Sequence, residues 1–153
     1  MPTNAIINFK NISDRLSIGG QPTIDQLMLL KDANFTMILQ LALKEVPTST
    51  QNEAYHARMR KLNYQMMEIS YNHPTVSDVE NFFQIMDAYP NERLYVHCSV
   101  GYCTSGLMVM YLMQREHLSY DASKHLVIPN WQPIPVWQDL IQTVTGMPIR
   151  ESA

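Results

Sequence analysis

Residues 94–106 have the sequence LYVHCSVGYCTSG, and this segment is the most informative one about the fold. Its first residues, 94–96, form a short apolar run that predicts a buried central strand. A tight loop containing Gly101 follows, and we expect a helix to begin near Ser105. This order places the Cys98 thiol at the carboxyl end of a strand, facing a helix N-terminus, and ligands bind at that edge of open α/β sheets.

The rest of the chain alternates predicted strands with predicted helices. Thr23 lies three residues before Gln26, which is a capping-box spacing, and Thr75 with Asp78 caps another helix. This alternation predicts an α/β fold with a central, mainly parallel sheet and helices on both faces. The expected strands are Arg15–Ile18, Phe35–Leu41 and Tyr64–Ile69. The helix after the Cys98 loop continues through the apolar run from Leu107, and weaker helical segments are expected near Asp121–Leu126 and Val136–Val144.

A second helix is expected between the strands at 35–41 and 64–69. Tyr55, Met59 and Leu62 recur at helical spacing and mark one face of it, and the helix closes at Asn63. Residues 44–52 contain Pro47 and several Thr and Ser residues, and they predict a loop before this helix.

Composition limits the class of protein. The chain has 153 residues, of which 46% are hydrophobic and 16% charged, and its formal net charge is -3. We expect one soluble domain over residues 1–153, able to bury ~70% of its unfolded surface without a disulfide or metal. The basic residues are scattered, which argues against nucleic acid or a membrane surface as partner.

The same sequence predicts a cytoplasmic protein. The N-terminal residues show no targeting segment, and the longest apolar run, Leu107–Met113, is far shorter than the ~20 residues of a membrane span. In a reducing cytoplasm, Cys98 and Cys103 are expected to be free thiols.

The loop after Cys98 predicts an anion site. Successive backbone N–H groups of such a loop converge on an anion, and the following helix adds positive potential. This field favours the thiolate form of a cysteine. A thiolate beside a phosphate-sized nest of amides suits nucleophilic displacement at phosphorus, because the sulfur attacks while the amides hold the equatorial oxygens.

Residues 96–105 resemble the signature loop of the cysteine-dependent protein tyrosine and dual-specificity phosphatases. Gly19–Thr23, Pro74-Thr75 and Trp131–Gln138 extend the resemblance to a small bacterial branch of that family, over roughly residues 10–145. The resemblance implies a protein tyrosine phosphatase-like fold and reaction with phosphate monoesters, on small molecules or phosphorylated proteins, without a cofactor or metal.

The resemblance also implies a role for individual residues. Cys98 would be the nucleophile, His97 a supporting residue behind the loop, and Ser105 the hydroxyl that helps the cysteine leave in the second step. The phosphate would be held by the loop residues Ser99, Val100, Gly101, Tyr102, Cys103 and Thr104.

The chain departs from the family at the loop arginine, which forks onto two phosphate oxygens in the transition state. The longer family loop aligns that arginine with Thr104, and the shorter loop of the bacterial branch aligns it with Cys103. Charge clamps of this kind are worth about three to five orders of magnitude in rate in phosphoryl-transfer enzymes, so we expect weak or absent phosphatase activity. The nearest basic residues in sequence are Arg93, Arg115 and Lys124.

Each of the three residues that mark the site has a second interpretation. Cys98 is either an active-site thiol or a relic, a small buried hydrophobe. Cys103 is a plain replacement of the arginine, a redox partner of Cys98, or an engineered or strain-specific change. His97 is either a hydrogen-bonded structural residue or a proton donor.

Two further groups of residues leave alternatives open. The family also uses an acid to protonate the leaving oxygen, and the chain offers Asp78, Glu68 and the non-acidic His73. A helix cap explains Asp78 better, as the solvent face of a strand explains Glu68 and an exposed turn explains His73. Trp131 and Trp137 either line a binding groove or clamp the last helix to the core.

Three functions therefore remain. The first is a phosphatase-like protein with a reactive thiol and weak or absent turnover. The second is a pseudophosphatase that binds an anionic or phosphorylated partner. The third is a thiol redox or sulfur-transfer protein, since rhodanese-type sulfurtransferases also place a reactive cysteine on such a loop.

Overall fold

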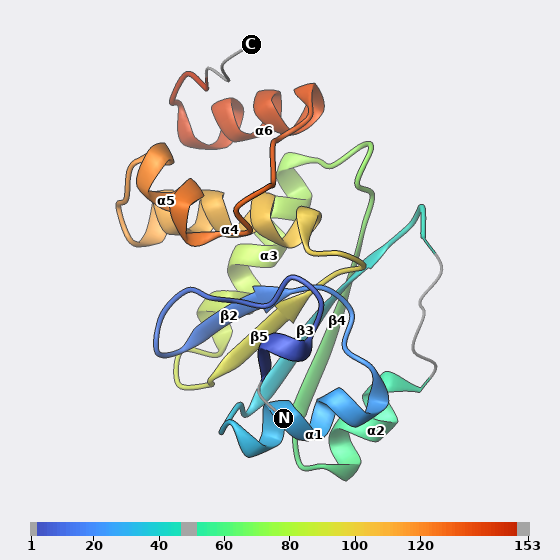
Figure 1. Cartoon of the computed structure of the whole chain (residues 1–153). Coiled ribbons are helices and arrows are strands. Elements are labelled where there is room, and N and C mark those ends of the chain that lie inside the picture. Colours follow the sequence, from blue (N-terminus) through green and yellow to red (C-terminus); the bar gives the residue numbers. More distant parts are fainter. Residues whose placement is uncertain (1–2, 47–51, 150–153) are drawn as a thin grey trace.

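The computed structural model describes residues 3–46 and 52–149. Its centre is a five-stranded sheet in the order β1-β2-β5-β3-β4 (Figure 1). The four longer strands are mutually parallel, and only β1 is antiparallel to its neighbour. The strand expected at 94–96 is therefore central, as predicted. The strands are β1 (Lys10–Asn11), β2 (Leu16–Gly19), β3 (Met37–Leu43), β4 (Asn63–Ile69) and β5 (Leu94–His97).

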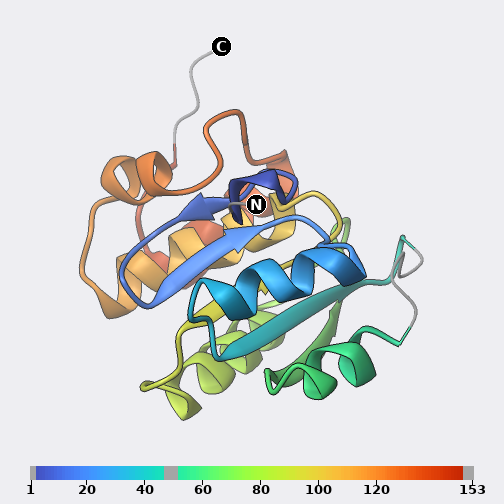
Figure 2. The ribbon, with the colours of Figure 1, turned by 60° about the horizontal axis from the view of Figure 1, so that its bottom comes forward.

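Helices cover both faces of the sheet, which confirms the expected α/β architecture (Figure 2). Helices α1 (Ile24–Asp32) and α2 (Glu53–Met59) lie on one face, with the short 3-10 helix Thr3–Ala5 beside α1. The helices on the other face are α3 (Val76–Ala88), α4 (Tyr102–Arg115), α5 (Tyr120–Leu126) and α6 (Pro135–Thr145). None of the helices in the described segments has the length and hydropathy of a membrane span.

Both predicted helix starts are capped by their own side chains. The Thr23 hydroxyl accepts the Gln26 N–H at 3.2 Å, and the Thr75 hydroxyl accepts the Asp78 N–H at 3.1 Å. The side chains of Gln26 and Asp78 return the bond to the backbone N–H of the capping threonine. These boxes fix where α1 and α3 begin.

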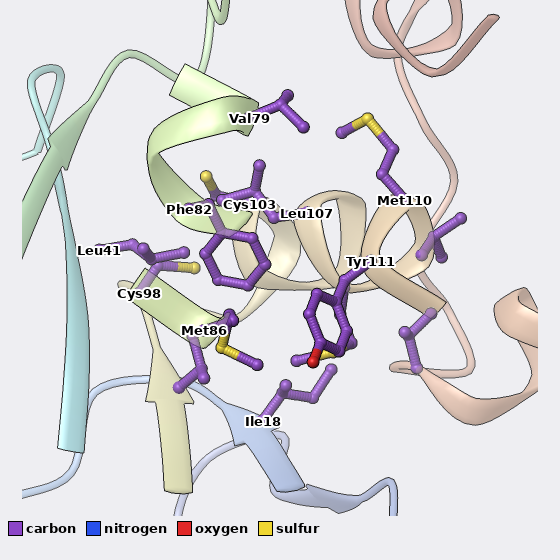
Figure 3. Close-up of a cluster of buried hydrophobic side chains, with 14 of the residues drawn as sticks. Ile18, Leu41, Val79, Phe82, Met86, Cys98, Cys103, Leu107, Met110 and Tyr111 are labelled. Carbon is purple, nitrogen blue, oxygen red and sulfur yellow. The ribbon is translucent and has the colours of Figure 1, made fainter. Parts of the chain in front are cut away.

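The two faces of the sheet bury two separate cores. The larger lies between the sheet and helices α3 to α6 and includes Phe82, Met86 and Met110 (Figure 3). The smaller lies under α1 and α2 and includes Leu27 and Phe35. Successive residues of β5 alternate between them, because side chains of a strand point to opposite faces. Leu94, Val96 and Cys98 belong to the larger core, and Tyr95 belongs to the smaller.

Two local predictions were wrong. Helix α4 begins at Tyr102 rather than near Ser105, because Gly101 adopts the left-handed conformation (φ 98°) and turns the chain three residues earlier. Helix α2 ends at Met59, and the apolar face expected for it is mostly in solvent, since Tyr55 is 60% and Met59 62% exposed.

Packing explains why the face of α2 expected to be buried is exposed. The helix is short and contacts β4 through the small, fully buried Ala57, which brings Glu53 inside as well. Leu62 is buried as expected, but it lies in the turn after the helix. Residues 47–51 of the predicted loop lie outside the described residues, and the sequence pattern also missed the short strand β1.

Candidate active site

The loop after β5 wraps around the Cys98 sulfur. The backbone N–H of Gly101 donates to Cys98 Sγ at 3.1 Å, and the N–H of Ser105 donates to the Gly101 carbonyl at 2.9 Å. A Cβ on Gly101 would lie 2.3 Å from Ile128 Cδ1 and 3.2 Å from the Gly19 backbone, in a conformation (φ 98°) that side chains rarely adopt. Glycine is therefore required here by both the turn and the packing.

Neighbouring segments hold the carbonyl groups of this loop. The Gln21 N–H donates to the Ser99 carbonyl at 3.0 Å, and Asn8 Nδ2 donates to the Val100 carbonyl at 2.9 Å. Within the described part of the chain, five N–H groups of the loop and first helical turn have no acceptor. These are the N–H groups of Ser99, Val100, Tyr102, Cys103 and Thr104. Unpaired donors at a helix start are available to an anion.

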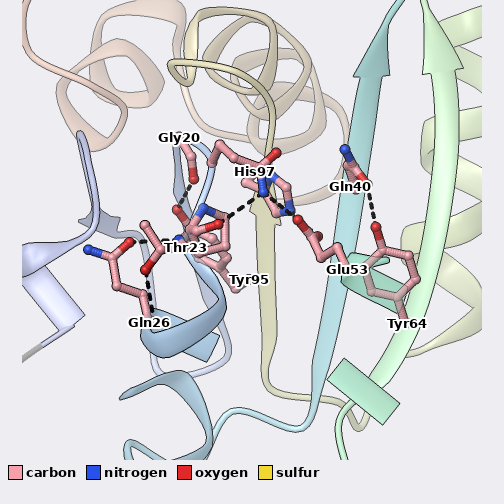
Figure 4. Close-up of polar contacts among 10 residues, drawn as sticks. Gly20, Thr23, Gln26, Gln40, Glu53, Tyr64, Tyr95 and His97 are labelled. Carbon is pink, nitrogen blue, oxygen red and sulfur yellow. Dashed lines mark hydrogen bonds and ion pairs between the residues drawn. The ribbon is translucent and has the colours of Figure 1, made fainter. Parts of the chain in front are cut away.

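A buried polar network lies on the other face of the sheet (Figure 4). His97 Nε2 is 2.7 Å from Glu53 Oε2, and both side chains are almost fully buried. Gln21 Nε2 donates to the second oxygen of Glu53. The Tyr95 ring stacks on His97 at 5.7 Å and donates its hydroxyl to the Gly20 carbonyl at 2.7 Å. This network fixes His97 behind the loop.

Glu53 is charged although it is buried. Burial alone would raise the pKa of its carboxyl group, but the hydrogen bond and charge of His97, with the hydrogen bond from Gln21, together lower that pKa below its ordinary value. A buried carboxylate with these partners stabilises one orientation of the imidazole. In the described residues, His97 Nδ1 has no hydrogen-bond partner.

Cys98 opens onto a pocket of about 180 Å³. The lining residues come from the loop, from the end of β3 and from the turn after β4, and none of them is Lys, Arg or His. They are Leu43, Glu45, Val46, Tyr71, Asn72, Cys98, Ser99, Val100, Tyr102 and Cys103. The pocket as described thus contains no cationic side chain.

Glu45 gives the pocket wall a negative charge. Its carboxylate accepts the Ser70 hydroxyl, the Tyr71 N–H at 2.8 Å and the Asn72 N–H at 3.1 Å. The Ser70 bond, with the two backbone bonds, outweighs the opposing effect of burial and lowers the pKa of Glu45 to about 2. The group is therefore ionised at any ordinary pH.

The two cysteines differ, although both line the pocket. Burial raises the pKa of the Cys103 thiol well above its ordinary value, and the charges of Cys98, Asp78 and Glu45 raise it further. Cys98 is also buried, but its sulfur accepts the Gly101 N–H. Cys103 is thus held as a neutral thiol.

The hydroxyls of Thr104 and Ser105 lie at the start of α4. Both residues are fully buried, and neither hydroxyl has a hydrogen-bond partner among the described residues. A buried hydroxyl without a partner is unusual, and a catalytic role is one of the reasons for which such groups are kept.

None of the three residues considered as proton donors lines the pocket. Asp78 belongs to the Thr75 capping box, Glu68 lies on the exposed side of β4, and His73 is exposed in the turn. The residues that sequence reasoning missed are Glu45 and Glu53. Nothing in their local sequence marks them, because each becomes part of the site only through contacts distant in the chain.

Both tryptophans belong to the larger core and neither lines the Cys98 pocket. Trp131 and Trp137 are both buried, and Trp137 Nε1 donates to the Tyr71 carbonyl at 2.8 Å. The Trp137 ring packs against Gly106, where a Cβ would come within 2.6 Å of it. Over the segments that the structure describes, no three His, Cys, Asp or Glu side chains are arranged to hold a metal.

Comparison with known proteins identifies the family. Residues 5–127 match the family described as "DSP-PTPase phosphatase fused to NAD+ Kinase". The chain belongs to this phosphatase family. No curated protein matches the sequence.

Solved structures agree with the family. A DUF442 phosphatase-like protein from Shewanella putrefaciens CN-32 is 25% identical, with a TM-score of 0.78 and 94% of each chain covered. PTPMT1 is 15% identical, with a TM-score of 0.75 and coverage of 90% of this chain and 94% of that one. P. aeruginosa TpbA in complex with phosphotyrosine is 12% identical, with a TM-score of 0.66 and coverage of 83% and 74%. The last two similarities concern the fold alone.

The expected resemblance and fold are thus confirmed. Residues 99–105, which form the loop and the start of α4, include no arginine. None of the three nearest basic residues in sequence lines the pocket. Arg93 lies over the Phe35 ring at 4.6 Å, and Arg115 pairs with Asp87 at 2.9 Å.

Proposed function

We propose that the chain binds phosphate monoesters at the Cys98 loop and hydrolyses them weakly or not at all. The observation that carries this proposal is the loop itself. Its unpaired amides surround a cysteine sulfur at the start of α4, in a chain of a phosphatase family. An array of amides of this kind binds the oxygens of an anion.

The proposal assigns a role to each residue of the loop. Cys98 is the nucleophile, and the amides of residues 99–104 hold the phosphate oxygens. Ser105 donates its hydroxyl to the departing Cys98 sulfur, and its lack of a partner among the described residues supports this role. His97 is a positioning residue, held from behind by Glu53.

Weak turnover follows from the charge of the pocket. Residues 99–105 include no arginine, and Glu45 adds a negative charge to the wall of the pocket that would hold a phosphate dianion. Stabilisation of developing charge is usually the largest contribution to such catalysis, so this site lacks the main source of rate. PTPMT1 has been solved with PI(5)P and TpbA with phosphotyrosine, which supports a phosphate monoester as ligand here. A cytoplasmic location stays a prediction.

A thiol exchange function is the second candidate, because Cys98 and Cys103 line the same pocket. The raised pKa of Cys103 disfavours it, since the thiolate is the reactive form. Formation of a Cys98–Cys103 disulfide under mild oxidant, without any binding of phosphate, would favour this candidate instead.

Restoring the arginine tests the proposal. Either Cys103→Arg or Thr104→Arg should raise hydrolysis of an aryl phosphate at least about a hundredfold, because removing one oxyanion donor costs about that much elsewhere. The position that responds also identifies the register of the loop. Glu116→Gln is the matched control, since it raises the net charge by the same one unit at the far end of α4.

The gain should depend on the thiol. Cys98→Ser in the responding variant should abolish it, because a hydroxyl does not form the nucleophilic anion at neutral pH. If both arginine variants stay folded and neither gains activity nor binds vanadate, the loop is no phosphate site and the proposal is wrong.

A further inference from the structure

The wall of the Cys98 pocket is negatively charged, whereas a site for a simple phosphate is expected to be positively charged. Glu45 is ionised, and among the described residues it makes no ion pair. No Lys, Arg or His is among the pocket's lining residues. A ligand that brings only a phosphate dianion would therefore bind against a like charge.

Hydrogen bonds from the turn after β4 hold the Glu45 carboxylate at the pocket wall. Ser70 and Asn72 donate to Oε2, and the Tyr71 N–H donates to Oε1. These three bonds fix the carboxylate in place, so that its negative charge stays at the pocket wall.

Aromatic side chains accompany this charge. Tyr71 and Tyr102 line the same pocket as Glu45, and Tyr102 is 41% exposed. A carboxylate next to aromatic rings can bind an ammonium group through ionic attraction and cation–π contact. The wall thus suits a cation, while the loop amides suit an anion.

We propose that the pocket selects phosphate monoesters that carry an alkylammonium group, with the phosphate on the Cys98 loop and the ammonium beside Glu45, Tyr71 and Tyr102. This inference rests on the proposed function, because it needs the loop to bind phosphate. The pocket volume of about 180 Å³ restricts the ligand to a small one, since drug-sized ligands occupy ~300–1,000 Å³.

A matched pair of ligands tests the inference. Phosphocholine and 3,3-dimethylbutyl phosphate have the same shape, and only the first has a positive charge. By calorimetry at low salt, phosphocholine should bind at least about tenfold more tightly, from ionic and cation–π attraction combined. Choline and inorganic phosphate serve as the single-charge probes, and each should bind more weakly than phosphocholine.

Variants assign the preference to residues. Glu45→Gln should reduce the preference for phosphocholine to near unity, and Glu116→Gln, which removes a charge from the exposed end of α4, should leave it unchanged. Because Glu45→Gln also alters the bonds to Ser70 and the turn, Tyr102→Leu is a second variant. It should lower the preference a few-fold while inorganic phosphate still binds.

The outcomes separate this inference from the proposed function. If both phosphate esters bind equally to the wild type, the inference is wrong and the proposed function stands. Failure of every phosphate to bind overturns both, and so does binding of choline as tight as that of phosphocholine. Two phosphoserine peptides, with Lys or Gln as the next residue, show whether a protein presents the same chemistry. If the ratio of affinities for the Lys and Gln peptides exceeds that for phosphocholine and 3,3-dimethylbutyl phosphate, the assignment of a small-molecule ligand is wrong.

Discussion

Cys98 and His97 are neighbours in the chain, but their side chains lie on opposite faces of the sheet in different surroundings. Cys98 joins an apolar core with Val96 and Phe82, and its sulfur has one backbone donor. His97 stacks on Tyr95 and pairs with the buried Glu53.

The different surroundings of Cys98 and His97 explain how the loop is held. Hydrogen bonds to a buried charge demand specific partners, whereas an apolar core demands mainly volume. On the side of His97, which we call the polar face, the bond to Glu53 therefore fixes the direction of the strand end. On the side of Cys98, which we call the apolar face, the larger core supplies a water-poor surrounding for the sulfur. Substitutions of similar size should have very different costs on the two faces.

The largest expected effect is on the polar face. Glu53→Ala should lower the free energy of unfolding by about 3–5 kcal/mol, because it leaves His97 buried without its partner and removes the acceptor of the half-buried Gln21. Asp87→Ala removes an exposed ion pair to Arg115 and should cost less than about 1 kcal/mol. Urea unfolding measures both, and equal costs would contradict the comparison.

The second-largest loss of stability is expected for a substitution in the Cys98 loop. Gly101→Ala adds a strained left-handed residue, at about 1–2 kcal/mol, and a contact with Ile128 and Gly19 that should cost about 1–3 kcal/mol more. Gly146 also has a positive φ, of 71°, but a Cβ there would meet nothing within 4 Å, so Gly146→Ala measures the backbone cost alone. If the two variants lose the same stability, the loop is not packed as described.

The apolar face should tolerate exchange. Met86 is fully buried in the larger core, and Met86→Leu conserves its volume and adds no polar atom. Its cost should stay below about 1.5 kcal/mol. A larger loss than that of Glu53→Ala, measured in the same urea experiment, would reverse the comparison between the two faces.

The smallest effect is a change of slope with pH. The folded-state pKa of Glu53 is lowered, so its contribution to stability is present above its ordinary pKa of 4.5 and is lost as the pH falls through the folded value. Glu53→Gln should therefore flatten the loss of stability on acidification, and Glu116→Gln should not. Parallel curves for wild type and Glu53→Gln below pH 5 would show that Glu53 is not held as a charged group.

The sequence predicted the parts of the fold that local patterns specify. The β5 strand, the Cys98 loop and the Thr23 and Thr75 caps depend on residues close together in the chain, and each was expected where it lies. The start of α4 was misplaced because the left-handed angle of Gly101 is not visible in a hydrophobic pattern.

The missed site residues needed the tertiary structure. Glu53 meets His97 across 44 positions of sequence, and Glu45 meets Ser70 across 25. Periodicity carries no information on such pairs. The face expected from Tyr55 and Met59 failed for the same reason, because contact with β4 through Ala57 decides which side of α2 is buried.

Alkylation of the two cysteines tests most directly whether the Cys98 loop is an oxyanion site. With iodoacetamide near neutral pH, and with the labelled peptides read by mass spectrometry, Cys98 should react faster than Cys103, whose pKa is raised by burial. Vanadate or phosphate should slow the reaction of Cys98 and leave that of Cys103 unchanged, because the anion would cover the sulfur on the loop amides. Equal rates at the two cysteines, unaffected by either anion, would contradict the account.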